Sequence, residues 1–227
     1  MRLSIVFFLL FFSVVVSAQS WEFEKPDYKK IEKKIKDKKS NLFYESLMNR
    51  FKNADSTLTL EEKRSLYYGY SFQSEYSPYS HSSYSDSIRD VLQLKAHSKA
   101  ELDKIIAFGD AVLAENPFDI RTLNYQLYAL EKNGEQALFE AKVIQMTSVI
   151  DALMSSGDGM TKETSFYVIF TAHEYDLLNI LGFEFGGSQS LIEHYDYLTL
   201  GENEYGIEGF YFDVSPCLDS MSKMLKE

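Results

Sequence analysis

Residues 98–134 read SKAELDKIIAFGDAVLAENPFDIRTLNYQLYALEKNG and carry the clearest helical pattern in the chain. The stretch opens on a capping box, because the Ser98 hydroxyl can satisfy an amide of the first turn while Glu101 reaches back to the Ser98 amide. Apolar residues then recur at the three- and four-residue spacing of one helix face. This helix stops before Pro117, since the residue before a proline disfavours helical geometry. Asp119 caps a second helix that runs to the end of the stretch.

A third helix is predicted from about Glu135 to Met154, where a turn rich in serine and glycine ends it. Consecutive helices joined by short turns lie antiparallel to one another. The three helices are therefore expected to form an array of helical hairpins, the arrangement found in helical bundles and repeats.

The residues upstream of this array are also expected to be helical. Apolar spacing predicts helices over 27–39 and 42–52. A second capping box starts at Thr59, with a glutamate three residues later, and opens a helix that runs to about Gln73. We therefore expect residues 19–156 to form a helical body.

The periodicity changes after Gly159, and residues 157–227 are expected to form a small α/β part packed on the helical body. The expected elements are strands over 166–170, 194–200 and 209–214 and a helix over 173–181. The glycine pair at 186–187 indicates a turn or a β-bulge. The predicted fold class is α+β, mainly α: antiparallel helical hairpins followed by a small, mostly antiparallel β-sheet.

Residues 1–18 have the three parts of a secretory signal peptide. Arg2 supplies the charged start, residues 3–16 are almost continuously apolar, and small residues precede a cleavage point after Ala18. The apolar run is shorter than the roughly 18–20 residues that a membrane-spanning helix needs. The residue directly after the cleavage point is Gln19 rather than a cysteine, so the chain is not expected to be a lipoprotein. We expect an exported bacterial protein, periplasmic or secreted, whose mature chain begins near Gln19 and has no transmembrane segment.

Composition excludes several classes of protein. The formal net charge is −11, and this acidic balance disfavours nucleic-acid binding, because phosphate contacts need a basic surface. Eight lysines fall within residues 25–39. We interpret them as the solvated face of one helix; the alternative is an arm that contacts anionic lipid or the acidic C-terminal part. Cys217 is the only cysteine in the sequence, so no intramolecular disulfide forms.

The sequence has no signature of catalysis or of a bound cofactor. It lacks a phosphate-binding Gly-Lys-Ser/Thr loop, a Gly-x-Ser-x-Gly nucleophile elbow and a Cys-x-x-Cys pair. We therefore expect a protein that is not an enzyme, with no cofactor and no catalytic residues.

Two short clusters place a histidine next to carboxylates, namely residues 173–176 and 193–196. Two imidazoles and a carboxylate that converge in space can bind zinc. The candidate ligands are His173, Asp176, His194 and Asp196. The clusters lack the histidine pair four residues apart that a metalloprotease helix carries. The favoured interpretation is therefore that both histidines make local hydrogen bonds, and a metal site is the alternative.

The tyrosines between the third predicted helix and residue 87 are candidates for recognition. Residues 74–87 contain a proline and several serines, which predicts a loop or irregular excursion. The loop shows no helix or strand periodicity that would place Tyr76, Tyr79 and Tyr84 on a buried face. Exposed tyrosines provide amphipathic contact area at low entropic cost. We expect these three to contact an envelope protein, a peptide or a glycan.

Residues 114–119, AENPFD, are followed by a helix and then by Gly134 and Ala137. This pattern resembles the junction between two tetratricopeptide repeats. The resemblance covers little more than one repeat, and Ile105 and Leu127 are large where the repeat has small residues. It implies helical hairpins similar to those of tetratricopeptide proteins rather than a full repeat array.

A broader resemblance rests on five short motifs distributed along the chain. They are Leu66-Tyr67-Tyr68-Gly69-Tyr70, Asn116-Pro117-Phe118-Asp119, Ser156-Gly157-Asp158-Gly159, His173-Glu174-Tyr175-Asp176-Leu177-Leu178 and Gly209-Phe210-Tyr211-Phe212. In these motifs the chain resembles an uncharacterised family of exported bacterial proteins, the domain-of-unknown-function family numbered forty-nine nineteen. The resemblance extends from about Asp27 to Val214. It implies no activity, since the family brings no catalytic or binding residues to carry over.

Two functions of different classes follow from the sequence. The preferred function is a non-enzymatic interaction module of the bacterial envelope, because hairpin arrays and tyrosine-rich loops suit binding and no catalytic motif is present. The alternative is a metal-assisted hydrolase that uses the clusters around His173 and His194.

Export makes a direct prediction. N-terminal sequencing of the protein recovered from the envelope or the medium is expected to give a chain that begins near Gln19, because the signal peptide is removed during export. An intact Met1 in the membrane fraction would contradict cleavage and indicate an uncleaved anchor.

Overall fold

The structure is a computed structural model that describes residues 23–226. The predicted signal peptide and its cleavage point after Ala18 lie outside these residues. The helices are α1 (Tyr28–Lys36), α2 (Tyr44–Lys52), α3 (Leu60–Gly69), the 3₁₀ turn η1 (Tyr70–Phe72), α4 (Ser83–Leu92), α5 (Lys99–Glu115), α6 (Ile120–Asn133), α7 (Gln136–Met154), α8 (Ala172–Ile180) and α9 (Ser215–Met224). The strands are β1 (Phe166–Tyr167), β2 (Phe185–Ile192), β3 (Tyr195–Leu200) and β4 (Gly209–Asp213).

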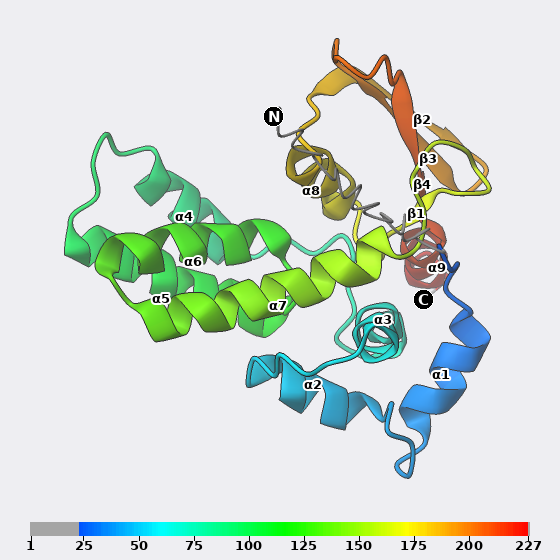
Figure 1. Cartoon of the computed structure of the whole chain (residues 1–227), viewed down its shortest axis with the longest axis horizontal. Helices are drawn as coiled ribbons and strands as arrows, with labels where there is room; N and C mark the ends of the chain where they lie inside the picture. Colours follow the sequence, from blue (N-terminus) through cyan, green and yellow to red (C-terminus); the bar gives the residue numbers. More distant parts are fainter. Residues whose placement is uncertain (1–22, 227) are drawn as a thin grey trace, which may run out of the picture.

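Helices α5, α6 and α7 form the predicted array of hairpins and pack against one another in sequence order (Figure 1). The Ser98 amide donates to the Glu101 carboxylate at 2.6 Å, as the capping box predicts. Asp119 accepts from the Thr122 amide at 2.8 Å and caps α6. Gly134 ends α6 with a φ of 72°, which glycine adopts without steric cost. The mainly helical body is therefore confirmed.

Two helices were missed by the sequence prediction. The predicted excursion over 74–87 is wrong in its second half, because α4 begins at Ser83 and the Ser82 hydroxyl accepts from the Tyr84 amide at 3.3 Å. Ile88 of α4 is buried against α5, and a single buried residue of this kind gives little periodic signal. The other missed helix is α9, which has Pro216 in its first turn, where proline is tolerated.

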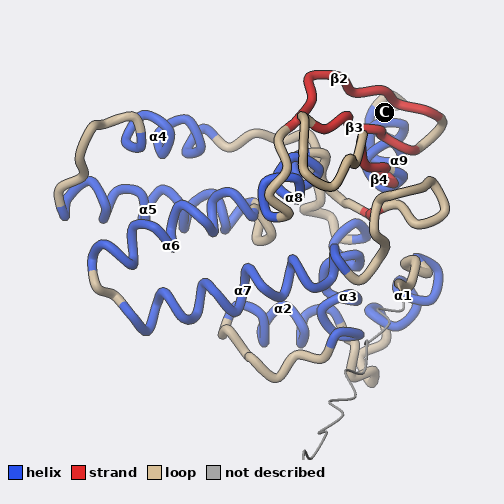
Figure 2. The backbone as a smooth tube through the Cα atoms, turned by 45° about the horizontal axis from the view of Figure 1, so that its top comes forward, coloured by secondary structure: helices blue, strands red, loops and turns tan. Residues whose placement is uncertain are grey.

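The sheet has four strands in the order β1-β4-β3-β2. The pairs β2–β3 and β3–β4 are antiparallel and β1–β4 is parallel, so the sheet is mostly antiparallel, as predicted. The pairing of β2 shifts register between Phe185 and Gln189, next to the glycine pair at 186–187. Strand β1 is shorter than the predicted 166–170, because the chain leaves the sheet and enters α8 at Ala172. Figure 2 shows the sheet and α8 at one end of the helical body.

One hydrophobic core joins the helical body to the sheet. Tyr68 of α3 and Phe118 before α6 are buried in the same cluster as Leu177 of α8 and Phe212 of β4. A smaller, separate cluster lies between α4, α5 and α6 and contains Ile88. The residues predicted as the helical body and those predicted as the C-terminal part thus share one core, and burial of its apolar area is the main source of stability.

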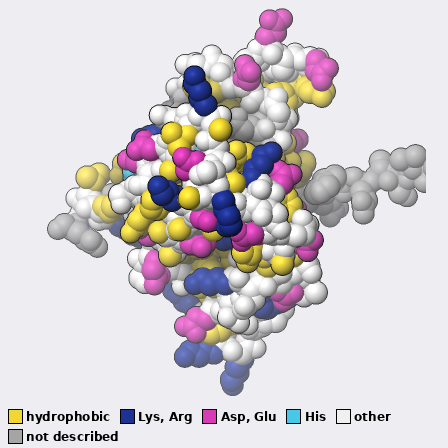
Figure 3. Space-filling model, turned by 90° about the vertical axis from the view of Figure 1, so that its left-hand side faces the viewer, with side chains coloured by type: hydrophobic (Ala, Val, Ile, Leu, Met, Phe, Trp, Pro, Cys, Tyr) yellow, Lys and Arg dark blue, Asp and Glu magenta, His cyan; other side chains and the backbone are white. Residues whose placement is uncertain are grey.

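The described surface carries mixed charge. On the face that Figure 3 shows, acidic and basic side chains are interspersed with apolar ones. The lysines of α1 lie mostly on its exposed face, while Ile31 and Ile35 face the core. Among residues 23–226, none of the helices combines the length and the apolarity that crossing a bilayer requires.

Candidate functional site

His173 of α8 lies in the core and makes hydrogen bonds through both ring nitrogens. Its Nε2 is 3.0 Å from the carbonyl oxygen of Phe118, which can only accept, so Nε2 carries the proton. Its Nδ1 therefore accepts from the Tyr67 hydroxyl at 2.7 Å. The same hydroxyl oxygen accepts from the Ile169 amide at 3.2 Å. Burial lowers the pKa of His173 to about 4, so the imidazole stays neutral. Its one free lone pair, on Nδ1, accepts the hydrogen bond from Tyr67 and is not available to a metal ion.

Glu174 and Asp196 form a buried carboxyl pair between α8 and β3. The side-chain amide of Gln189 donates to Asp196 Oδ2 at 2.6 Å and lies 3.5 Å from Glu174 Oε2. The other carboxyl oxygens, Glu174 Oε1 and Asp196 Oδ1, are buried and have no hydrogen-bond partner within residues 23–226. Burial, followed by the charge of Asp196, raises the pKa of Glu174 to about 9. Glu174 is therefore protonated at neutral pH.

The other candidate ligands have separate partners. Asp176 accepts from the Arg121 guanidinium at 2.9 Å, and its pKa is nonetheless raised because burial outweighs the nearby positive charge. The His194 Nε2 lies 3.5 Å from Asp213 Oδ2. In the described part of the chain, no group of three or more histidine, cysteine, aspartate or glutamate side chains is placed to hold a metal ion.

The predicted metal set is therefore wrong as a site. The four side chains do not form one site. His173 and Asp176 line the same cavity, but His173 is held by a carbonyl and a tyrosine and Asp176 by an arginine. His194 lies beside Asp213, and Asp196 accepts from Gln189. What the sequence could not show is which buried groups already pair these side chains in the core.

The three tyrosines predicted to contact a partner differ in their exposure to solvent. Tyr76 packs its ring against Tyr70 and Phe170, and its hydroxyl donates to the Ile169 carbonyl at 2.6 Å. The expectation that Tyr76 lies free in a loop is wrong, because the chain after η1 turns into the core. Tyr79 and Tyr84 are 40% and 41% exposed, and the Tyr84 ring stacks on Phe108 of α5.

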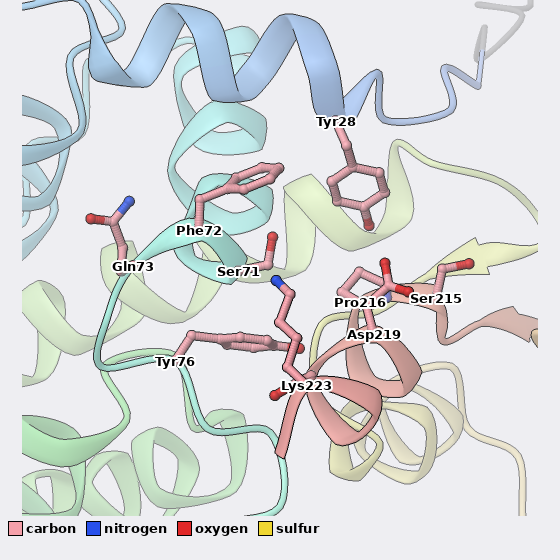
Figure 4. A pocket seen from close by; sticks show the side chains of 10 residues that line it. Tyr28, Ser71, Phe72, Gln73, Tyr76, Ser215, Pro216, Asp219 and Lys223 are labelled. Atoms are coloured by element: carbon pink, nitrogen blue, oxygen red, sulfur yellow. The ribbon is translucent and has the colours of Figure 1, made fainter. Parts of the chain in front are cut away.

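The partly buried Tyr76 lines a cleft of about 280 Å³ between α1, residues 71–76 and α9, which we call the α9 cleft (Figure 4). Tyr28 of α1 points into this cleft, and Phe72 of η1 lines it beside Tyr28. The rings of Tyr28 and Phe72 meet edge to face at 6.3 Å between centroids. Aromatic rings thus form one wall of the α9 cleft.

Polar side chains of α9 form the opposite wall. Ser215, Asp219 and Lys223 are spaced four residues apart and so share one helix face. None of the three side chains makes an ion pair or a side-chain hydrogen bond within residues 23–226. The Tyr28 hydroxyl is buried and also lacks a partner in this part of the chain, and burial raises its pKa, so it keeps its proton. The cleft therefore offers free hydrogen-bonding groups of both kinds beside aromatic faces.

The α9 cleft is not among the sites predicted from the sequence, although one signal for it is present there. Ser215, Asp219 and Lys223 are spaced as on one polar face of a helix, and Pro216 is placed where a helix begins. Tyr28 carries no such signal, because its position at the cleft depends on packing against Tyr68 and Phe72, which lie some forty residues further along the chain.

The comparisons with known proteins define the family. The family profile described as a domain of unknown function (DUF4919) matches residues 29–223, so the chain belongs to this family. The match confirms the broader of the two resemblances and gives no support to the tetratricopeptide one. No curated protein and no solved structure shows significant similarity to the chain.

The carboxyl pair predicts an unusual dependence of stability on pH. An unfolded glutamate loses its proton near pH 4.5, whereas folded Glu174 keeps it to about pH 9, so the folded state loses stability as the pH rises between these values. Glu174→Gln mimics the protonated side chain at every pH. At pH 8 this variant is expected to exceed the wild type in free energy of unfolding by about 4–5 kcal/mol, and the difference shrinks toward pH 5.

Denaturant unfolding at several pH values measures this difference. The control is Glu184→Gln, which removes a carboxylate from an exposed position near the same sheet. If the wild type and Glu174→Gln show parallel stability curves between pH 5 and 8, the carboxyl pair is not protonated in the folded state.

Proposed function

We propose that this protein is an exported, non-enzymatic binding protein of the bacterial envelope, and that its α9 cleft holds a polar segment of a peptide or a glycan. The observation that carries the proposal is the Tyr28 hydroxyl, which is buried at the cleft without a hydrogen-bond partner within residues 23–226. A buried polar group of this kind costs free energy unless something pairs with it. A ligand group in the cleft supplies the missing partner.

The chemistry of the walls indicates the class of ligand. Aromatic rings such as those of Phe72 and Tyr76 pack well against sugar rings and peptide planes. The opposite wall has one carboxylate, Asp219, and one ammonium group, Lys223, so its charge is balanced. Binding sites combine apolar surface with a few polar groups that orient the ligand, and their volumes start at about 300 Å³. At about 280 Å³ the α9 cleft has the size of the smallest such sites. A neutral, hydrogen-bonding ligand therefore fits the α9 cleft best.

The envelope location rests on the signal peptide predicted over residues 1–18. The exposed Tyr79 and Tyr84 lie outside the α9 cleft lining and remain candidates for a protein contact, as the sequence suggested.

The test uses nuclear magnetic resonance of the mature chain with two probes, an N-acetylglucosamine oligomer and an uncharged alanine-rich hexapeptide. At least one probe is expected to shift the resonances of Tyr28, Phe72 and α9. Tyr28→Phe removes only the unpaired hydroxyl, so it is expected to weaken binding about fivefold or more while stability stays equal or rises by about 1 kcal/mol.

Tyr84→Phe is the matched control, because it removes a hydroxyl from an exposed tyrosine outside the cleft. It is expected to leave binding unchanged. Shifts confined to other surfaces, or equal binding by Tyr28→Phe and the wild type, would show that the α9 cleft is not the binding site.

A further inference from the structure

A second cleft lies between α2, residues 70–75 and the C-terminal end of α5, and we call it the α2–α5 cleft. Its volume is about 540 Å³. Gln73 lines both this cleft and the α9 cleft, so the two are separated by the chain segment that follows α3. Nothing in the family match assigns a role to either cleft.

The α2–α5 cleft is strongly acidic. Glu45, Glu75 and Glu115 line it, and Lys52 is the single basic residue of the lining. Within residues 23–226 none of the three carboxylates makes an ion pair or a side-chain hydrogen bond. Three carboxylates thus face the cleft against one ammonium group, which leaves a net negative charge in the lining.

The end of α5 adds to the negative potential. The C-terminal end of a helix carries a partial negative charge and is stabilised by cations. The last turn of α5 has no basic residue, and the helix ends on Glu115. A carboxylate at this position is unfavourable for the free helix, and a bound cation removes that cost.

Tyr44 provides an independent indication of a ligand. It is only 8% exposed, it lines the cleft, and its buried hydroxyl has no hydrogen-bond partner within residues 23–226. Burial, followed by the nearby Tyr70 and Glu75, raises the pKa of Tyr44, so the hydroxyl stays neutral. A neutral hydroxyl oxygen accepts a hydrogen bond from an ammonium group, and the aromatic faces of Tyr44 and Tyr70 attract a cation.

We propose that the α2–α5 cleft binds an alkylammonium ligand, in which carbon chains carry terminal –NH₃⁺ groups. The carboxylates of Glu75 and Glu115 and the Tyr44 hydroxyl pair with the ammonium hydrogens, and the aromatic rings and Met48 cover the carbon chain. This chemistry occurs in free polyamines and in lysine side chains. A bare divalent ion does not use the apolar lining, and the described residues contain no group placed to hold a metal ion.

Isothermal titration calorimetry of the mature chain at low ionic strength tests the proposal. The probes are spermidine, N-acetyl-lysine methylamide and calcium chloride. Saturable binding of spermidine alone identifies a free polyamine as the source of the ammonium group, and binding of the lysine amide identifies a protein or peptide. Absence of binding by both ammonium probes, or equally strong binding of calcium, overturns the proposal.

Variants separate the cleft from general electrostatic attraction. Glu75→Gln combined with Glu115→Gln is expected to weaken ammonium binding at least about tenfold, because each lost carboxylate removes a charge-assisted hydrogen bond. Glu202→Gln combined with Glu204→Gln, on the exposed loop between β3 and β4, makes the same charge change outside the cleft and is expected to alter binding less than about twofold. Equal weakening by both pairs contradicts a specific site.

Tyr44→Phe tests the hydroxyl. It is expected to weaken ammonium binding several-fold while the melting temperature stays equal or rises, because the hydroxyl has no partner to lose within the described chain. Unchanged binding by a folded Tyr44→Phe overturns the assignment of Tyr44. Tyr28 lines the α9 cleft and not the α2–α5 cleft, so Tyr28→Phe is expected to leave ammonium binding unchanged. The two proposed binding sites are therefore tested independently of each other.

Discussion

The hydrogen bonds of His173 connect three parts of the chain that are far apart in sequence. The imidazole accepts from Tyr67 of α3 and donates to the carbonyl of Phe118, just before α6. Tyr67 in turn accepts from the Ile169 amide, between β1 and α8. Each group is buried, so loss of one partner leaves another unpaired at a cost of about 1–3 kcal/mol. This chain of hydrogen bonds fixes the position of α8 and the end of β1 relative to the helical body.

Tyr67 and Tyr76 also bound the segment of chain that separates the two clefts. The segment from Tyr67 to Tyr76 starts in the core and returns to it, since Tyr76 donates to the carbonyl of Ile169. Between these two anchors, η1 and Gln73 reach the surface and separate the α9 cleft from the α2–α5 cleft. The tyrosine-rich region thus acts mainly as a shared wall. The two clefts differ in charge, which is balanced in the first and acidic in the second.

Local signals in the sequence predicted much of the fold. The capping boxes at Ser98 and Thr59 mark the starts of α5 and α3, and the glycine after α6 marks its end, because caps depend on a few neighbouring residues. Helix α4 was missed because its capping serine is one of many serines and Ile88 is the only fully buried residue it contributes.

The sites were harder to predict than the elements. The predicted metal set was not found because the partners of His173 and Asp176 come from the chain around Phe118 and Arg121, more than fifty residues away in the sequence. Tyr76 was expected in solvent, and its burial depends on Phe170, more than ninety residues further along the chain. The clefts depend in the same way on contacts between distant segments, such as Tyr28 of α1 with Phe72 of η1, that no local pattern encodes.

The central claim is that His173 is a neutral structural residue that fixes the arrangement of the core. The most direct test is a nitrogen-detected nuclear magnetic resonance titration of the His173 imidazole in the mature chain. The structure predicts a single neutral tautomer with the proton on Nε2, retained as the pH falls until about pH 4. Protonation of His173 near its ordinary pKa of 6.5, or a proton on Nδ1, would contradict the account.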